Sequence, residues 1–503
     1  MSQFSGRLLH VAAIFVLLLV PLLFFWDMVI LGHEPLAADT QAVKPLGHWA
    51  TDAHEELGEV PLWCPGIFAG MPSYGSFIYT PTSPLNLVRN IRLALGENRG
   101  ARYFLSITVG ALALYFWMVW RRRHPLAALG GALIFIMTPY FLGLVSAGHS
   151  TKLHALYLAP AVFFALDAFL ARRTLAMAIL LATAVAMQLW CNHPQISYYT
   201  LFLGALYAGG VLLFDRPNAW RGRRWPGGLA LGVLALAVAA ALMLEPYAAV
   251  LEYTPHSIRG STSVLSEDAA GGDAASGNAA AEDAASGGDA SGGAASGGGA
   301  RGGDASGGDA SGGGASGGGV DWSYATAWSY PPQEIICFLF PAVYGLQGKP
   351  YWGELTFTQS THYFGATVLV LMAVGLLLSG GRRRWVWLVL MGVTLLIGFG
   401  RYFPVLYGPM YHGLPMFDRF RVPSMIYSFL PLFAAVLAVD GLQGILAWMP
   451  QGKSSTKVGV STSIPPSNSS GSKAPATKGS GSRASAARSS VSRKPVPVSP
   501  GSS

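Results

Sequence analysis

Charged residues are scarce in this sequence. Asp, Glu, Lys and Arg make up 12% of the 503 residues, whereas hydrophobic residues make up 52%. Soluble domains usually carry about 25% charged residues. The apolar residues also gather in runs of roughly 17 to 24, which are long enough to cross a ~30 Å hydrocarbon core as helices. The composition therefore excludes an ordinary soluble protein and predicts an all-α polytopic membrane protein.

Cysteine is also rare, and common metal and nucleotide motifs are missing. Cys64, Cys191 and Cys337 are an odd set that gives no disulfide framework. No His-Glu-x-x-His or Cys-x-x-Cys motif occurs, which argues against a zinc site. A Gly-rich phosphate loop with Lys is absent as well, which argues against a cytoplasmic nucleotide-driven motor. No cofactor is predicted, and a requirement for a divalent metal is left open.

Few ionisable residues fall inside the apolar runs. Asp167 and Asp440 lie near the predicted cytoplasmic ends of their apolar runs, and Asp27 and Glu245 lie near the predicted outer ends of theirs. Ion-coupled transporters usually need ionisable groups deep in the membrane. Their scarcity favours chemistry at one membrane surface over ion-coupled transport.

Ten apolar runs are predicted to span the membrane. The first is too long for a signal-peptide core and lacks a small-residue cleavage site, so it is interpreted as an uncleaved anchor. The predicted spans are residues 8–31, 103–120, 125–145, 154–170, 174–190, 198–214, 227–247, 363–378, 385–399 and 424–448.

The distribution of Lys and Arg supports this topology. With the N-terminus in the cytoplasm, the short inward loops carry the arginines of residues 121–123, 172–173, 216–224 and 382–384. The short outward loops carry only Lys152, Arg401, Arg419 and Arg421. Because Lys and Arg are retained on the cytoplasmic side during insertion, both termini are predicted to be cytoplasmic.

Two low-complexity segments divide the chain. Residues 267–319 form a Gly/Ala/Ser/Asp insert, and residues 450–503 form a basic tail. Neither can bury enough apolar surface to become ordered, so both are predicted to be disordered. The tail also lacks the aromatic residues typical of nucleic-acid binding, so no nucleic-acid partner is predicted. The membrane parts are then spans one to seven in residues 1–266, with a first extracytoplasmic loop at 32–102, and an extracytoplasmic loop with spans eight to ten in residues 320–449.

The loops placed outside hold most of the histidines and many aromatic residues. Cationic donors beside rings suit a phosphorylated sugar, because the cations offset phosphate charge and the rings pack against sugar faces. A nearby carboxylate can remove the acceptor proton. A purely structural explanation stays open, since aromatic residues concentrate at membrane interfaces whatever the function.

Individual residues are predicted to fill three roles. Asp39 is the predicted general base, with Asp52 in reserve, and the alternative for Asp39 is a cap of a short surface helix. Fixed cations help most where charge builds on a departing phosphate, and the predicted donor-phosphate ligands are His149, Lys152, His154, Asn192, His193 and Arg259. The predicted sugar- or lipid-binding residues are Trp63, Trp328, Trp352 and Glu354.

Short strings in these loops resemble the YfhO-like family of bacterial multi-spanning membrane proteins, over roughly residues 8–445. Besides Asp39, they are Glu59-x-Pro61-Leu62-Trp63…Gly70-Met71-Pro72, Gly148-His149-Ser150-x-Lys152-x-His154, Asn192-His193-Pro194-Gln195, Tyr324-Ala325-x-x-Trp328-Ser329, Tyr351-Trp352-Gly353-Glu354 and Phe417-Asp418-Arg419-Phe420-Arg421. That family belongs to the membrane glycosyltransferases of the C-type fold.

The resemblance implies a C-type glycosyltransferase-like enzyme of the bacterial inner membrane, with its site on the extracytoplasmic side. Such an enzyme would take a sugar from a polyprenyl-phosphate donor in the lipid bilayer and pass it to an envelope glycan or lipid acceptor. Asp39 would be the catalytic acid of the first loop. Two alternatives from other classes are a flippase or exporter of lipid-linked substrates and a non-catalytic membrane scaffold.

Overall fold

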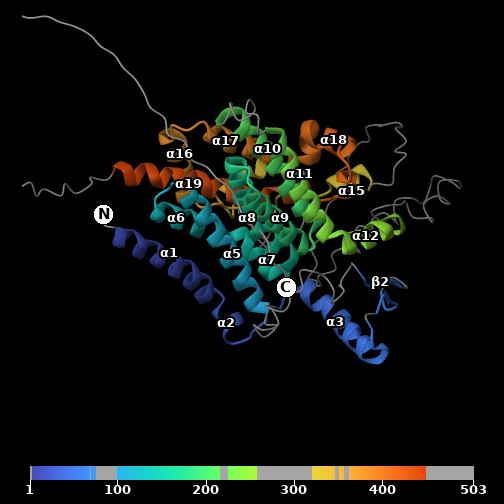
Figure 1. Ribbon diagram of the computed structural model, residues 1–503. Helices are drawn as coiled ribbons and strands as arrows, with labels where there is room; N and C mark the ends of the chain where they lie inside the picture. The colour runs from blue at the N-terminus through green and yellow to red at the C-terminus, as the bar shows by residue number, and fades with distance from the viewer. Residues whose placement is uncertain are drawn as a thin grey trace, which may run out of the picture. The chain divides into compact units, whose positions relative to one another are not determined.

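The structure, a computed structural model, describes residues 3–34, 36–59, 61–67, 70–74, 99–215, 225–257, 320–345, 351–355 and 362–448 (Figure 1). The predicted insert and the predicted basic tail lie outside these residues. The part of the chain that is described is mostly helical and carries the apolar helices of a multi-pass membrane protein.

The elements follow one another in three groups. The N-terminal group contains helices α1 (Gln3–Phe24), α2 (Trp26–Val29) and α3 (Ala38–Leu57), and the two-residue strands β1 (Trp63–Cys64) and β2 (Met71–Pro72). The central group contains α5 (Arg99–Trp120), α6 (Pro125–Ile136), α7 (Pro139–Ala147), α8 (Ser150–Arg172), α9 (Leu175–Trp190), α10 (Pro194–Gly210), the π turn η1 (Val211–Asp215), α11 (Trp225–Leu242), α12 (Leu244–Tyr253) and the 3-10 turn η3 (Thr254–His256). The C-terminal group contains α15 (Trp322–Thr326), η4 (Pro332–Phe338), α16 (Ala366–Leu378), α17 (Arg383–Gly398), η5 (Gly400–Tyr402), α18 (Pro404–Gly413), η6 (Phe417–Arg419), η7 (Pro423–Phe429) and α19 (Leu430–Trp448).

Six helical stretches among the described residues are long and apolar enough to cross a membrane: Gly6–Phe24, Gly100–Trp120, Pro125–Ala147, Ser150–Arg172, Pro194–Phe214 and Pro423–Trp448. A seventh is possible if Pro226–Leu242 and Tyr247–His256, which are bent by 70° relative to each other, form one broken span. Each remaining predicted span coincides with a shorter helix, α9, α16 or α17. The number ten therefore stays a prediction.

Local sequence signals set the helix ends in the central group. Pro125 and Pro139 begin α6 and α7, at the helix position that tolerates proline best. Gly148 ends α7 with φ of 87°, a left-handed conformation that suits glycine. The hydroxyl of Thr174 accepts a hydrogen bond from the amide of Met177 and so caps α9. These caps satisfy backbone groups that a helix leaves open at its ends.

The centre of the core is α19, whose residues from Leu430 to Gly441 are all buried. Helix α16 runs beside it (Figure 1), and two glycines allow the backbones to touch. A Cβ atom added at Gly441 would lie 2.1 Å from the carbonyl oxygen of Leu371, and one added at Gly375 would lie 2.2 Å from that of Leu437. Small residues at such crossings are typical of helix pairs in membranes, where close packing replaces the hydrophobic effect.

Candidate functional site

The two candidate bases both lie on helix α3. Asp39 is in its first turn, and its side chain is outside what the structure describes. The N-cap residue of α3 is Ala37 rather than Asp39, and the helix is 20 residues long. Asp39 is therefore not the N-cap residue of a short helix. Asp52 is exposed and lies thirteen residues further on, which is about 20 Å along a helix. A single small site therefore cannot use both carboxylates.

The Trp63 string forms a small hairpin. Trp63 pairs with Pro72 and Cys64 with Met71 in the antiparallel strands β1 and β2. Gly70 has φ of 119°, and a Cβ atom there would lie 2.6 Å from the indole of Trp63. The absence of a side chain at Gly70 thus allows the indole to pack against the backbone there. Trp63 remains 56% exposed, so a ligand can reach it.

The string from Gly148 to His154 forms the start of helix α8. His149 is the N-cap residue, and Lys152 lies in the first turn. The Nδ1 atom of His154 lies 2.6 Å from the hydroxyl of Ser106 on α5, and the His154 ring lies 5.5 Å from that of Tyr103. A helix N-terminus favours anions, and Lys152 adds a positive charge at the same place. A phosphate bound there would be stabilised by both.

A buried histidine, His362, interacts electrostatically with Lys152. Its ring stacks on Tyr140 with 4.5 Å between the ring centroids, and Tyr330 and Tyr427 meet it at 5.6 Å. Burial, and secondarily the charge of Lys152, lower the pKa of His362 to about 3. His362 is therefore neutral at physiological pH and can exchange a hydrogen bond without adding charge.

Asn192 and His193 mark the start of α10. Asn192 has φ of 53°, a conformation that asparagine tolerates better than most residues. The Nδ1 atom of His193 accepts a hydrogen bond from the amide of Ile196 at 3.3 Å and so caps the helix. Both predicted phosphate ligands thus have an observed structural role.

Three of the quoted strings meet around Arg421. The Gln195 side-chain amide donates to the carbonyl oxygen of Arg421 at 2.6 Å. The guanidinium of Arg421 donates to the hydroxyl of Tyr324 at 2.8 Å and lies 5.0 Å from the Trp328 ring centroid. Cation–π contacts of this kind hold a guanidinium against an aromatic ring. The structure therefore joins the start of α10, helix α15 and the segment after η6.

The string from Tyr351 to Glu354 is anchored by a buried carboxylate. Glu334 is 3% exposed, and its two oxygens accept hydrogen bonds from the Tyr351 hydroxyl at 2.6 Å and from the amides of Glu354 and Leu355 at 2.7 and 3.0 Å. The Glu354 carboxylate accepts from Tyr402 at 2.9 Å. Trp352 is 77% exposed, and its indole N–H donates to the carbonyl oxygen of Val343.

The segment from Trp328 to Tyr330 links these clusters. Trp328 contacts Arg421, the hydroxyl of Ser329 accepts from the amide of Arg401, and Tyr330 contacts His362. The sequence analysis assigns no role to Arg421 or Tyr324, although an arginine beside aromatic residues is a usable signal. Nothing local in the sequence marks Glu334 or His362, because their burial depends on long-range packing.

Four other residues named from the sequence remain, Arg259 and the three cysteines. Arg259 lies outside the described residues. Cys64, Cys191 and Cys337 are unpaired, and burial raises the pKa of the Cys191 thiol to about 12. Among the described residues, no group of three or more His, Cys, Asp or Glu side chains is arranged to hold a metal ion.

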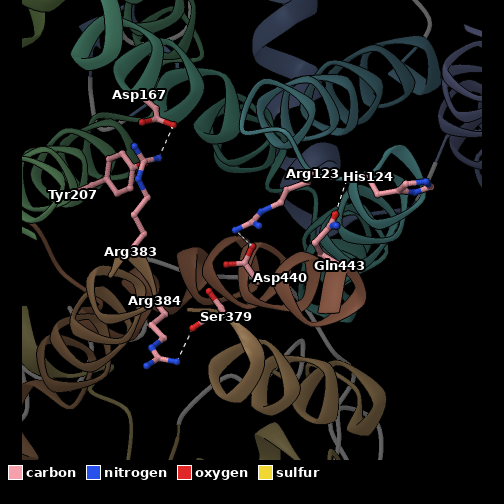
Figure 2. Close-up of polar contacts among 9 residues, drawn as sticks. All are labelled: Arg123, His124, Asp167, Tyr207, Ser379, Arg383, Arg384, Asp440 and Gln443. Carbon is pink, nitrogen blue, oxygen red and sulfur yellow. Dashed lines mark hydrogen bonds and ion pairs between the residues drawn. The ribbon is translucent and has the colours of Figure 1, made fainter. Parts of the chain in front are cut away.

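A second polar cluster surrounds a cavity of about 310 Å³ at the other end of α8. Asp167 lies fifteen residues after Lys152, or about 22 Å along the helix. Figure 2 shows Arg383 pointing to Asp167 and Tyr207, and Arg123 pointing to Asp440. The lining residues are Trp120, Arg121, Arg122, Arg123, Asp167, Ser379, Gly381, Arg383 and Asp440, and this set is called the arginine pocket below.

Both acids of the arginine pocket are paired. A guanidinium nitrogen of Arg383 lies 3.0 Å from Oδ2 of Asp167, which also accepts from the Trp117 indole at 3.1 Å. A guanidinium nitrogen of Arg123 lies 2.7 Å from Asp440. Burial lowers the pKa of Arg123, the Asp440 carboxylate opposes this, and the charges of Arg121 and Arg383 lower it further. Burial is the largest cause of the lowered pKa of Arg123, and the two neighbouring cations add to it.

Comparison with known proteins finds no relative: no family model, no curated protein and no solved structure matches this chain.

Proposed function

We propose that the protein is a glycosyltransferase-like membrane enzyme that takes a sugar from a polyprenyl-phosphate donor on the extracytoplasmic side. The observation that carries the proposal is the meeting of Gln195, Trp328 and Arg421, which come from three distant parts of the chain. Through Tyr330, this cluster adjoins His362 and its neighbour Lys152. Cations, rings and a helix N-terminus thus occupy one region.

Each group has a task in this proposal. Lys152 and the N-terminus of α8 bind the donor phosphate and stabilise the charge that develops as the sugar–phosphate bond breaks. Trp328, Trp63 and Trp352 offer apolar faces to the sugar or the lipid. Asp39 removes the proton of the acceptor hydroxyl, which then attacks the anomeric carbon while polyprenyl phosphate departs. The acceptor is an envelope glycan or lipid.

The test compares cells that lack the protein with cells that carry the wild-type chain, Asp39→Asn, Asp52→Asn or Glu56→Gln. Polyprenyl-phosphate-linked sugars are extracted and identified by mass spectrometry, and protein amounts are matched by immunoblot. Glu56 is exposed on the same helix and provides the matched loss of one negative charge. We expect Asp39→Asn to accumulate the same donor as the deletion, and Glu56→Gln to behave as the wild type.

The outcomes separate the alternatives. Full function of Asp39→Asn with loss in Asp52→Asn would move the base to Asp52. Full function of both, together with donor accumulation in the deletion, would favour a flippase over a transferase. No change in lipid-linked sugars in the deletion would leave a scaffold and contradict the proposal.

A further inference from the structure

The arginine pocket has more positive charge than its own acids neutralise. Four arginines line it, against two aspartates that are already engaged by Arg383 and Arg123. That leaves Arg121 and Arg122, two cations that do not form either close ion pair. The cavity is of a size at the lower end of small-ligand sites.

Arg121 is the most informative of these residues. Its Nη1 atom is buried and has no hydrogen-bond partner among the described residues. Arg121 also interacts electrostatically with Asp167 and with Arg123, so it is close to both ion pairs. Buried polar groups without partners are uncommon, and a bound ligand is one way to satisfy them.

Membrane topology alone explains that arginines occur in these loops, but it does not explain this arrangement. Arg382 and Arg384 belong to the same loop run and do not line the cavity. Arg384 instead donates to the carbonyl oxygen of Ser379 just after α16 (Figure 2). It also donates to the carbonyl oxygen of Leu376. The lining arginines come from the α5–α6 connection and from the start of α17, and they converge on acids in α8 and α19.

We propose that the arginine pocket binds a phosphate group, supplied by an anionic lipid headgroup or by a free phosphate compound. Guanidinium groups match the geometry of phosphate oxygens and bind them in a forked manner. Trp120 at the end of α5 lines the pocket, and the guanidinium of Arg172 lies 4.3 Å from its ring. Trp and Arg gather at the level of lipid headgroups, which puts the pocket within reach of a lipid phosphate.

The test uses the full-length protein in detergent. It is titrated with inorganic phosphate at constant ionic strength, and separately with mixed micelles containing phosphatidylglycerol or phosphatidylcholine. Binding is measured as the rise in Tm and as lipid retained in native mass spectrometry. The wild type is compared with Arg121→Gln, Arg122→Gln and, as the matched control outside the pocket, Arg382→Gln.

We expect Arg121→Gln to weaken binding at least about tenfold, which corresponds to the loss of one charged hydrogen bond. Arg382→Gln should bind as the wild type does. Because Arg122 is exposed, Arg122→Gln tests the same pocket even if Arg121→Gln fails to fold, and it should weaken binding as well. Binding of phosphate alone identifies a free phosphate compound as the ligand, binding of phosphatidylglycerol alone identifies a lipid headgroup, and binding of both fits the shared chemistry.

Two results would overturn the proposal. One is the absence of any response to inorganic phosphate and to phosphatidylglycerol. The other is an equal loss in Arg121→Gln, Arg122→Gln and Arg382→Gln, which would indicate general surface charge rather than a pocket. Either result leaves the proposed transferase untouched, because that function depends on the opposite end of α8 and on donor accumulation in cells.

Discussion

Positive charge is compensated in different ways near the two ends of helix α8. At the Asp167 end, Arg383 and Arg123 are held by buried carboxylates. At the Lys152 end, the cations lie among rings, with Arg421 over Trp328 and Lys152 near His362. Removing one member of a buried ion pair leaves an uncompensated charge, whereas removing a cation from a half-exposed ring costs little. The two ion pairs at the first end are therefore suited to stability, whereas the cations at the second end are suited to exchanging partners with a ligand.

The largest expected effect comes from breaking the Asp167–Arg383 pair. Arg383→Gln should lower the free energy of unfolding by about 3–5 kcal/mol, because it leaves the buried Asp167 carboxylate without its closest guanidinium partner. Unfolding of purified protein in detergent, followed by circular dichroism, measures this. The double variant Asp167→Asn/Arg383→Gln should recover much of the loss, since it removes both charges.

The control for this comparison is Arg382→Gln, which removes the same charge from the neighbouring exposed position. Its effect should be small. If Arg383→Gln were as mild as Arg382→Gln, the ion pair would not hold α17 to α8, and the contrast between the two ends would lose its physical basis.

A smaller effect is expected at the other end. Arg421→Leu loses the cation–π contacts with Trp328 and Tyr324 and the hydrogen bond to the Tyr324 hydroxyl. We expect a loss of about 1–2 kcal/mol in the same unfolding assay. Arg421→Lys keeps the charge but not the planar guanidinium, so it should fall in between. A loss as large as that of Arg383→Gln would contradict the division of roles.

The pH dependence of stability should sharpen the comparison further. The pKa of His362 is about 3 in the folded protein and about 6.5 in an unfolded chain, so the unfolded state binds more protons between these values. The contribution of neutral His362 to stability is therefore fully present above pH 6.5 and is lost progressively as the pH decreases toward 3. His362→Phe keeps a ring beside Tyr140 and should flatten this part of the profile.

The measurement is Tm between pH 7 and pH 5, taken for the wild type, His362→Phe and Arg383→Gln. Arginine does not titrate in this range, so Arg383→Gln should shift the profile without removing its slope. An unchanged slope in His362→Phe would mean that His362 is not held neutral in the folded protein.

The sequence predicted the class of fold well and the site only in part. Apolar length and the positions of arginine locate helices α5, α8 and α19, since both signals are local. They do not reveal that α6 and α7 break at Pro139, or that α11 and α12 bend by 70°, so predicted spans and observed helices differ in length. Whether each crosses a bilayer depends on the surrounding lipid as well as on length.

The site shows the same limit. Residue type alone marks the strings around Gln195, Trp328 and Arg421, and the structure brings them together. The same reasoning predicts a ligand role for His193, and the structure shows that its Nδ1 atom caps α10. The ligand role of His193 stays a prediction. The sequence shows Asp167 and Asp440 only as charges near the ends of spans, since their arginine partners lie hundreds of residues away in the chain.

The smallest effect on stability is expected at Trp352, because its exposed side chain adds little to the fold although it has a proposed role in ligand binding. The side chain is 77% exposed and makes one surface hydrogen bond, so Trp352→Ala should change the free energy of unfolding by less than about 1 kcal/mol. In the cell assay for lipid-linked sugars, however, it should behave as a partial loss of function if the indole contacts the sugar or lipid. Trp328→Ala provides the matched test, because it also removes the ring beneath Arg421 and should affect both stability and function. If Trp352→Ala instead left the sugars unchanged, the ligand surface would be confined to the residues around Arg421 and Lys152, and the string from Tyr351 to Glu354 would serve only to close the fold over Glu334.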